Sequence, residues 1–226
     1  MTRNEYSIIE SYMLNKMHDS AHDKHHVYRV LYAALDIADS IKESDANVLI
    51  AACLLHDIGR EKQFANPNLC HAQEGGKIAN EFLLSQGWSK EKANHVMDCI
   101  STHRFRGDNL PQSIEAKILF DADKLEASGA MGIARTLIYK GQVDEPLYNL
   151  SKEGNILFDD KENATNSFFQ EYNFKLKNIY DAFYTVRARE IAAMRQKTAI
   201  DFYNGLLSEI TDNYKYGIDK LNSIII

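Results

Sequence analysis

The chain has 226 residues, of which 45% are hydrophobic and 26% charged, with only 3 prolines and 11 glycines. This composition is typical of a folded globular protein, and it excludes an intrinsically disordered chain. The formal charge of -6, from 26 basic and 32 acidic side chains, gives no general attraction for nucleic acid or for an anionic membrane. We therefore expect neither a nucleic-acid polymer nor a membrane as a partner.

Apolar side chains recur at helical spacing along most of the chain, and the alternation typical of strands is scarce. Asp45, Ser89 and Ser113 each precede such a stretch and are predicted N-caps. The fold class we predict is all-α, a helical bundle in one domain over residues 1–226, because no repeat or linker divides the chain. Helices are predicted over residues 5–17, 24–42, 46–58, 71–87, 89–103, 113–125, 131–139, 166–182 and 185–210.

Cysteine usage and the apolar runs indicate the compartment. Cys53, Cys70 and Cys99 form no Cys-x-x-Cys pair, so neither a disulfide framework nor a thiolate zinc site is indicated. The first residues lack the apolar segment of a secretion signal. The longest apolar run, residues 48–55, is far shorter than the roughly 20 residues that span a membrane. We expect a cytoplasmic protein.

The same run, residues 48–55, is apolar on all sides and predicts the most buried helix. His56 and Asp57 follow it directly, and a buried carboxylate without a partner is costly. A metal ion held by both residues would compensate the charge; the structural alternative is that Asp57 pairs with an arginine or caps a neighbouring helix. Adjacent residues point about 100° apart on a helix. The two side chains therefore share an ion only if the helix relaxes near Gly59.

All eight histidines lie in the first half of the chain, several of them beside aspartates. Imidazole and carboxylate together suit a divalent ion such as Mn²⁺, Mg²⁺, Fe²⁺ or Zn²⁺. For His18, His22 and His95 a surface position is the simpler interpretation, since their neighbours demand no special role.

Four segments of the chain carry a family resemblance: residues 22–30, 54–59, 121–135 and 185–195. Through them the chain resembles the HD superfamily of metal-dependent phosphohydrolases, and the resemblance covers nearly all of the chain. The first segment is similar to the family's His-Asp-x-x-His-x-x-Arg-Val opening and the second to its His-Asp doublet. The last two are similar to the distal aspartate segment and the C-terminal helix of a bacterial subgroup that includes nucleotide pyrophosphohydrolases. This implies a metal-site core over residues 18–130, completed by C-terminal helices over 131–226.

The resemblance also implies the ligands of a divalent ion, whose identity among Mn, Mg, Fe, Co, Ni and Zn is left open. Periodicity does not separate Asp121 from Asp123, which point about 200° apart, so at most one of them is expected to ligate. His25 beside His26 poses the same ambiguity, and the family's spacing to Arg29 selects His26. The implied ligands are His26, His56, Asp57 and Asp123.

Such an ion lowers the pKa of a bound water and neutralises charge that develops on phosphorus. Hydrolysis of a phosphate ester or anhydride of a small molecule, a nucleotide in the first place, is the expected reaction. Cationic side chains near the motifs are the candidates for binding the substrate's phosphate. They are Arg60, Lys62, Arg104, Arg106 and Lys124.

The general base is open. Several relatives carry a glutamate three residues after the doublet's aspartate, where this chain has Arg60, with Glu61 next. Glu61, His71 and a water held by Asp57 are the candidates. His71 and His103 are also candidates for binding a second ion, as in two-metal members of the superfamily, or for contacting the substrate.

Three hypotheses follow. The leading one is a single-metal phosphohydrolase acting on a small phosphorylated compound. The second is a two-metal phosphodiesterase or a di-iron oxygenase-type enzyme that uses His71 and His103. The third is a metal-binding regulatory module without turnover. The Gly-Tyr-Pro motif of cyclic-dinucleotide phosphodiesterases is absent after Asp57. Whether the chain forms a homo-oligomer is left open.

Overall fold

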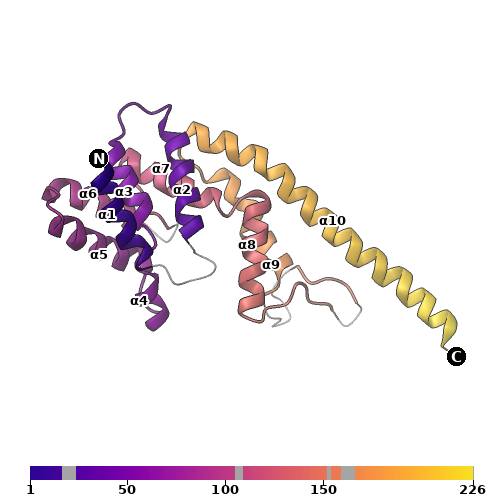
Figure 1. The fold of residues 1–226 in the computed structure, drawn as a ribbon. Helices are drawn as coiled ribbons and strands as arrows, with labels where there is room; N and C mark the ends of the chain where they lie inside the picture. Colours follow the sequence, from indigo (N-terminus) through magenta and orange to yellow (C-terminus); the bar gives the residue numbers. More distant parts are fainter. Residues whose placement is uncertain (17–23, 105–108, 152–153, 159–165, 226) are drawn as a thin grey trace. The chain divides into compact units, whose positions relative to one another are not determined.

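The structure is a computed structural model that describes residues 1–16, 24–104, 109–151, 154–158 and 166–225. Within these ranges the secondary structure is helical (Figure 1). The β-structure of the described residues is one isolated antiparallel bridge between Leu150 and Ile156. The all-α fold class is thereby confirmed. Among the described residues, no helix combines the length and the apolar character needed to cross a membrane.

The chain divides into two compact units. The N-terminal unit comprises Met1–Glu126 and Phe183–Arg189, and the C-terminal unit comprises Ala127–Ala182 and Glu190–Ile226. The metal-site residues predicted from the sequence all fall in the N-terminal unit. One domain over residues 1–226 stays a prediction.

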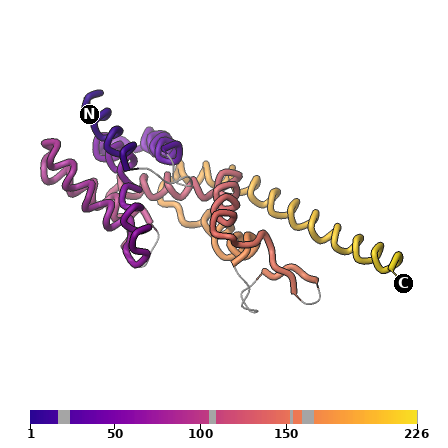
Figure 2. Tube along the Cα trace, turned by 60° about the horizontal axis from the view of Figure 1, so that its bottom comes forward, coloured from indigo at the N-terminus to yellow at the C-terminus, as the bar shows by residue number. Residues whose placement is uncertain are grey.

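The N-terminal unit is built around α3. Seven of the ten residues of this helix are buried, which confirms that it is the most apolar and enclosed segment of the unit. It packs against α1, α2, α6 and α7, and α5 and α6 lie side by side in both Figure 1 and Figure 2. The helices of the unit are α1 (Arg3–Leu14), α2 (Lys24–Ala38), α3 (Ala46–Leu55), α4 (Arg60–Ala65), α5 (His71–Ser85), α6 (Lys90–Ser101) and α7 (Ile114–Leu125).

The predicted N-caps are confirmed, since the side chains of Asp45, Ser89 and Ser113 accept hydrogen bonds from backbone N–H groups of α3, α6 and α7. Helix α3 ends at Leu55, so residues 56–59 form a turn. The regular α-helix therefore stops at the His-Asp pair, although His56 itself keeps right-handed helical dihedral angles. Helix α4 was not predicted, because six residues are too few to show a helical period.

The C-terminal unit contains α8 (Gly129–Gln142), α9 (Phe168–Phe174), the 3-10 helix η1 (Leu176–Asp181) and most of α10 (Val186–Ile224). Its core is aromatic, with Phe168, Phe169 and Tyr172 packed among buried aliphatic side chains.

Two predicted helices of this unit need correction. The single helix expected over 166–182 is wrong: Asn178 donates its side-chain amide to the Phe174 carbonyl, and the chain tightens from α9 into η1. The helix expected to end at 210 continues to Ile224. Its last turns are exposed, so no buried face marks their helicity in the sequence.

Candidate metal centre

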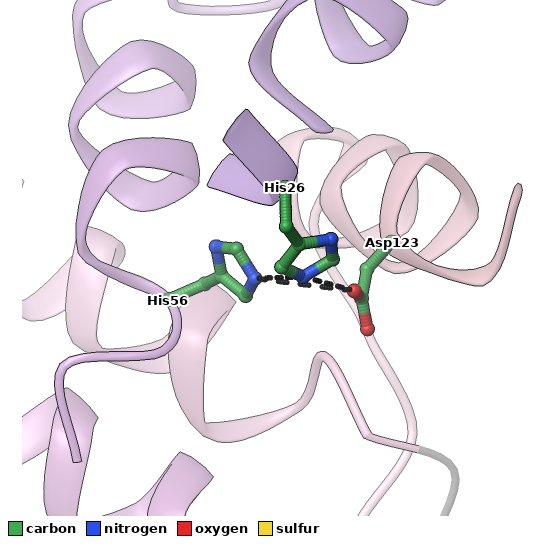
Figure 3. A group of neighbouring side chains, drawn as sticks. All are labelled: His26, His56 and Asp123. Atoms are coloured by element: carbon green, nitrogen blue, oxygen red, sulfur yellow. Dashed lines mark hydrogen bonds and ion pairs between the residues drawn. The ribbon is translucent and has the colours of Figure 1, made fainter. Parts of the chain in front are cut away.

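Two helices and one turn bring the predicted ligands together. His26 lies in the first turn of α2, His56 and Asp57 in the turn after α3, and Asp123 in the last turn of α7. Helix α2 packs against both α3 and α7. Figure 3 shows the side chains of His26, His56 and Asp123 pointing toward one another.

The three side chains of Figure 3 converge on one point. Nε2 of His26 lies 3.3 Å from Nε2 of His56 and 3.4 Å from Oδ1 of Asp123. Nε2 of His56 lies 3.9 Å from the same Asp123 oxygen. Both imidazoles are buried, whereas the Asp123 side chain is 27% exposed. Two nitrogen donors and one oxygen donor within 4.8 Å of one another are arranged as for one shared cation.

Asp57 lies between two pairs of histidines. Its Oδ2 lies 3.6 Å from Nε2 of His26 and 3.5 Å from Nε2 of His56. Its Oδ1 lies 3.3 Å from Nε2 of His71 and 3.8 Å from Nε2 of His103. The donor atoms of Asp57, His71 and His103 form a second group within 4.8 Å of one another. Each carboxylate oxygen thus faces a different pair of imidazoles.

The Asp57 carboxylate is 1% exposed, and among the described residues neither of its oxygens has a hydrogen-bond partner. Nε of Arg60 lies 2.7 Å from Oδ2, so the arginine considered as the structural alternative is present as an ion pair. Nε2 of His71 is also buried without a hydrogen-bond partner in the described part of the chain. The Arg60 guanidinium offsets one negative charge. The Asp123 carboxylate adds a second negative charge to the cluster, and a further cation would offset it.

The imidazoles are oriented by acceptors on their far side. A neutral imidazole that donates from Nδ1 presents a lone pair at Nε2, the form that ligates a metal. His26, His56 and His103 each place Nδ1 against an oxygen, and we assign Nδ1 as the donor in all three. The acceptors are Glu126 Oε2 at 3.2 Å, the Cys53 carbonyl at 2.8 Å and the Ile100 carbonyl at 2.6 Å.

The electrostatics of the cluster favour a bound cation. Burial lowers the pKa of His26, but the nearby carboxylates of Asp123, Asp57 and Glu126 outweigh this effect and raise that pKa to about 10. Burial raises the pKa of Asp57, yet the charges of His56 and Arg60 hold it well below its usual range. Three acids thus surround one imidazole. In the absence of a metal ion, a proton on His26 supplies the positive charge.

The second pair of histidines behaves differently. Burial, together with the charge of Arg60, lowers the pKa of His71 to about 2, and burial with the charge of His56 lowers the pKa of His103 to about 4. Both are therefore neutral near pH 7. A neutral imidazole is the form in which histidine ligates a metal or accepts a proton.

The structure separates the residue pairs that periodicity left open. The Asp121 carboxylate accepts hydrogen bonds from the backbone N–H of Tyr184 at 2.9 Å and from the backbone N–H and hydroxyl of Thr185, both at 2.7 Å. It anchors the segment that leads into α10, whereas Asp123 faces the histidines. His25 is exposed, and its neighbour His26 is buried.

Two of the candidate residues contact other parts of the surface. The Glu61 side chain is 67% exposed and lies 3.9 Å from Lys16. Lys62 forms an ion pair with Glu74 at 3.0 Å, and its side chain is half exposed. Neither of these two contacts is with a carboxylate of the cluster.

The remaining cations differ in their distance from the cluster. Arg104 Nη1 lies 3.3 Å from Nδ1 of His71, so it reaches the second pair of histidines. Lys124 Nζ lies 4.6 Å from the centre of the Phe120 ring. His95, expected at the surface, is one-third exposed and pairs with Glu115 at 3.1 Å. The candidates His18, His22 and Arg106 lie outside the described residues.

Sequence reasoning missed Glu126. This residue is buried at the C-terminus of α7, where its carboxylate contacts His26 and Arg29. The available signal was its spacing, since Glu126 follows Asp123 by three residues and so lies one helical turn further along.

A family model for the HD domain matches residues 24–128, a range that includes all four predicted ligands. The Bacillus subtilis protein YpgQ, described as uncharacterized, is 32% identical over 195 residues, which cover 84% of this chain and 85% of YpgQ. The chain belongs to the HD domain family. Members of this family bind divalent metals, so a divalent ion is the expected cofactor.

Solved structures support the same conclusion. A crystal structure of Bacillus subtilis YpgQ in complex with ADP has a TM-score of 0.70 and 27% identity, covering 91% of this chain and 97% of that one. A protein from an uncultured Thermotogales bacterium, described as a predicted HD superfamily hydrolase, has a TM-score of 0.60 and 28% identity, covering 92% of each chain. The likeness to the Thermotogales protein supports hydrolase activity in this chain.

Proposed function

We propose that this HD protein is a metal-dependent phosphohydrolase that cleaves a phosphate ester or anhydride of a nucleotide. The observation that carries the proposal is the convergence of His26, His56 and Asp123 on one point beside the buried Asp57 carboxylate. That YpgQ has been crystallised with ADP supports a nucleotide as the substrate.

The residues present fit a divalent ion. His26, His56, Asp57 and Asp123 offer two imidazole nitrogens and two carboxylates, a donor set suited to Mn, Mg, Fe, Co, Ni or Zn. The buried oxygens of Asp57, which have no hydrogen-bond partner in the described part of the chain, point to the same conclusion. When bound, such an ion would lower the pKa of a water and polarise a phosphoryl oxygen.

The side chains around the ion site would divide the remaining tasks. Asp57 is held as a carboxylate by Arg60 and His56, so it accepts hydrogen bonds from a water placed beside it. His71 is the candidate for the general base that lies nearer to the cluster, because its Nε2 is buried 3.3 Å from Oδ1 of Asp57. Glu61, two-thirds exposed and close to Lys16, is less well placed.

The substrate's phosphates need cationic partners, and two arginines adjoin the cluster. Arg60 contacts Asp57, and Arg104 contacts His71. One guanidinium group can donate two parallel hydrogen bonds to phosphate oxygens, so both arginines are suited to this role. His103 lies on the same side as His71, with ring centroids 5.4 Å apart, and would contribute to the same phosphate-binding region. Lys124, next to Asp123, remains a further candidate, whereas Lys62 is half exposed and pairs with Glu74.

A second candidate function rests on the group formed by Asp57, His71 and His103. If this group held an ion as well, Asp57, His71 and His103 would be its ligands, and Asp57 would belong to both ligand sets. A two-metal centre would extend the chemistry to phosphodiester cleavage or, with two irons, to oxygen-dependent oxidation. The number of ions per chain separates it from the single-metal enzyme.

A substrate screen tests the proposal. The purified protein would be stripped with a chelator, reloaded with Mn²⁺ and incubated with nucleoside mono-, di- and triphosphates while phosphate and pyrophosphate are measured. We expect release that depends on Mn²⁺ and is lost in His56→Ala but kept in His95→Ala, a histidine outside the cluster. Tight Mn²⁺ binding without turnover on any phosphorylated compound would instead favour the regulatory module.

A further inference from the structure

Glu126 is a buried acid that the proposed chemistry does not use. Its Oε2 lies 3.2 Å from Nδ1 of His26 and 2.8 Å from both Nε and Nη2 of Arg29. The side chain is 5% exposed. A buried carboxylate is costly unless it is paired, so this arrangement needs a physical reason.

We propose that Glu126 is a positioning residue that fixes His26 as an Nε2 donor toward the bound ion. The proposal rests on the function proposed above, because it presupposes that His26 is a ligand. Glu126 accepts the Nδ1 proton of His26, which leaves the lone pair on Nε2. The negative charge behind the ring also increases the basicity of Nε2 and so strengthens its bond to a metal.

Helix α7 holds His26 by both of its ring nitrogens. Asp123 Oδ1 lies 3.4 Å from Nε2, and Glu126 Oε2 lies 3.2 Å from Nδ1. The two acids are three residues apart and so occupy the same side of the end of α7. The ring plane of His26 is therefore set from one helix, with one acid on the ion side and the other behind the ring.

Arg29 completes the arrangement. It follows His26 by three residues on α2, so both side chains leave the same face of that helix toward α7. Its two contacts of 2.8 Å orient the Glu126 carboxylate and supply its counter-charge. His26 is therefore not required to carry that counter-charge, and its Nε2 is available for the ion.

His26 differs in this respect from the other two histidines with assigned Nδ1 acceptors. His56 and His103 donate to the backbone carbonyls of Cys53 and Ile100. A carbonyl fixes the tautomer, but it carries no full charge. Removal of Glu126 should therefore affect metal affinity through both the orientation and the charge behind His26.

The test is the affinity of the chelator-stripped protein for Mn²⁺, measured by titration calorimetry. Glu126→Gln keeps an acceptor oxygen and removes the charge, whereas Glu126→Ala removes both. We expect the dissociation constant for Mn²⁺ to rise by about 10- to 100-fold in Glu126→Ala and by a smaller factor in Glu126→Gln. The matched control is Glu115→Gln, since Glu115 is equally buried on α7 and pairs with a histidine, His95, outside the cluster.

A second measurement needs no variant. In the Zn²⁺-loaded wild-type protein labelled with ¹⁵N-histidine, we expect a proton on Nδ1 of His26 and a metal-bound Nε2. Ligation through Nδ1 would overturn the proposal even if the alanine variant failed to fold. Affinities of both Glu126 variants within roughly twofold of wild type would also overturn it. A wild-type protein that binds no Mn²⁺ would instead refute the proposed function itself, and the two failures are thus distinguishable.

Discussion

The carboxylate of Asp57 lies 3.3 Å from Nε2 of His71, and both groups are buried without a hydrogen-bond partner among the described residues. The carboxylate is held ionised and the imidazole neutral. An anion beside an unprotonated ring leaves its charge partly uncompensated, which is the arrangement expected where a cation or a substrate completes the site.

The first prediction concerns the ligands. Alanine at His26, His56, Asp57 or Asp123 should lower both Mn²⁺ content and activity by orders of magnitude, because each change removes a donor from the ion. Elemental analysis and a phosphate-release assay on the same preparations check this. Retention of ion and turnover in Asp123→Ala would contradict the assignment of the distal ligand.

The second prediction separates Asp121 from Asp123. Asp121→Ala should keep its Mn²⁺ and lose stability, because the backbone N–H groups of Tyr184 and Thr185 lose a buried acceptor. A loss of about 1–3 kcal/mol in the free energy of unfolding is expected. Urea denaturation of the metal-free protein measures it. Loss of the ion from the folded variant would show that Asp121 has a role at the metal centre.

The third prediction concerns the number of ions. A single-metal enzyme should carry about one ion per chain, and His103→Ala should change kcat/KM without lowering that number. A stoichiometry near two that falls in His71→Ala or His103→Ala would establish the second group as a metal site.

The fourth prediction concerns the phosphate. Arg60→Ala should lower kcat/KM for a phosphorylated substrate by roughly 30-fold or more, because a charge-assisted contact to the transferred group acts mainly in the transition state. Lys62→Ala should behave like wild type, since Lys62 is half exposed and pairs with Glu74. Metal content is measured in both variants. Wild-type kinetics in Arg60→Ala would contradict this role of Arg60 and would indicate that Arg104 or Lys124 binds the phosphate.

The fifth prediction follows from the raised pKa of His26 in the metal-free protein. The folded-state pKa of about 10 lies above the ordinary value of 6.5, so protonated His26 stabilises the fold. This contribution is fully present below about pH 6.5 and is lost as the pH rises through about 10. Denaturation of the metal-free wild type and of His26→Gln across this range measures it. A stability difference between the two that does not vary with pH would contradict the raised pKa.

The sequence predicted the all-α class, the buried helix before His56 and the caps at Asp45, Ser89 and Ser113, because each depends on local pattern. It also named the four side chains that the structure brings together, through a family resemblance and not through periodicity. The close approach of His26 to Asp123 depends on how α2 packs against α7, which no local pattern encodes.

Other features depend on tertiary contacts and escaped prediction. The partnership of Glu126 with His26 joins residues 100 positions apart. The break between α9 and η1 reflects side-chain amides that compete for backbone carbonyls. The role of Asp121 depends on the backbone N–H groups of Tyr184 and Thr185, which donate to its carboxylate from a distant part of the chain.

The central claim is that the cluster of His26, His56, Asp57 and Asp123 binds a divalent ion that supports phosphate hydrolysis. The most direct test measures phosphate or pyrophosphate release from a nucleoside triphosphate by the chelator-stripped protein as Mn²⁺ is added back, with His56→Ala assayed in parallel. We expect activity that rises with the occupancy of the site and is absent from His56→Ala. Equal activity in the stripped, reloaded and His56→Ala proteins would contradict it.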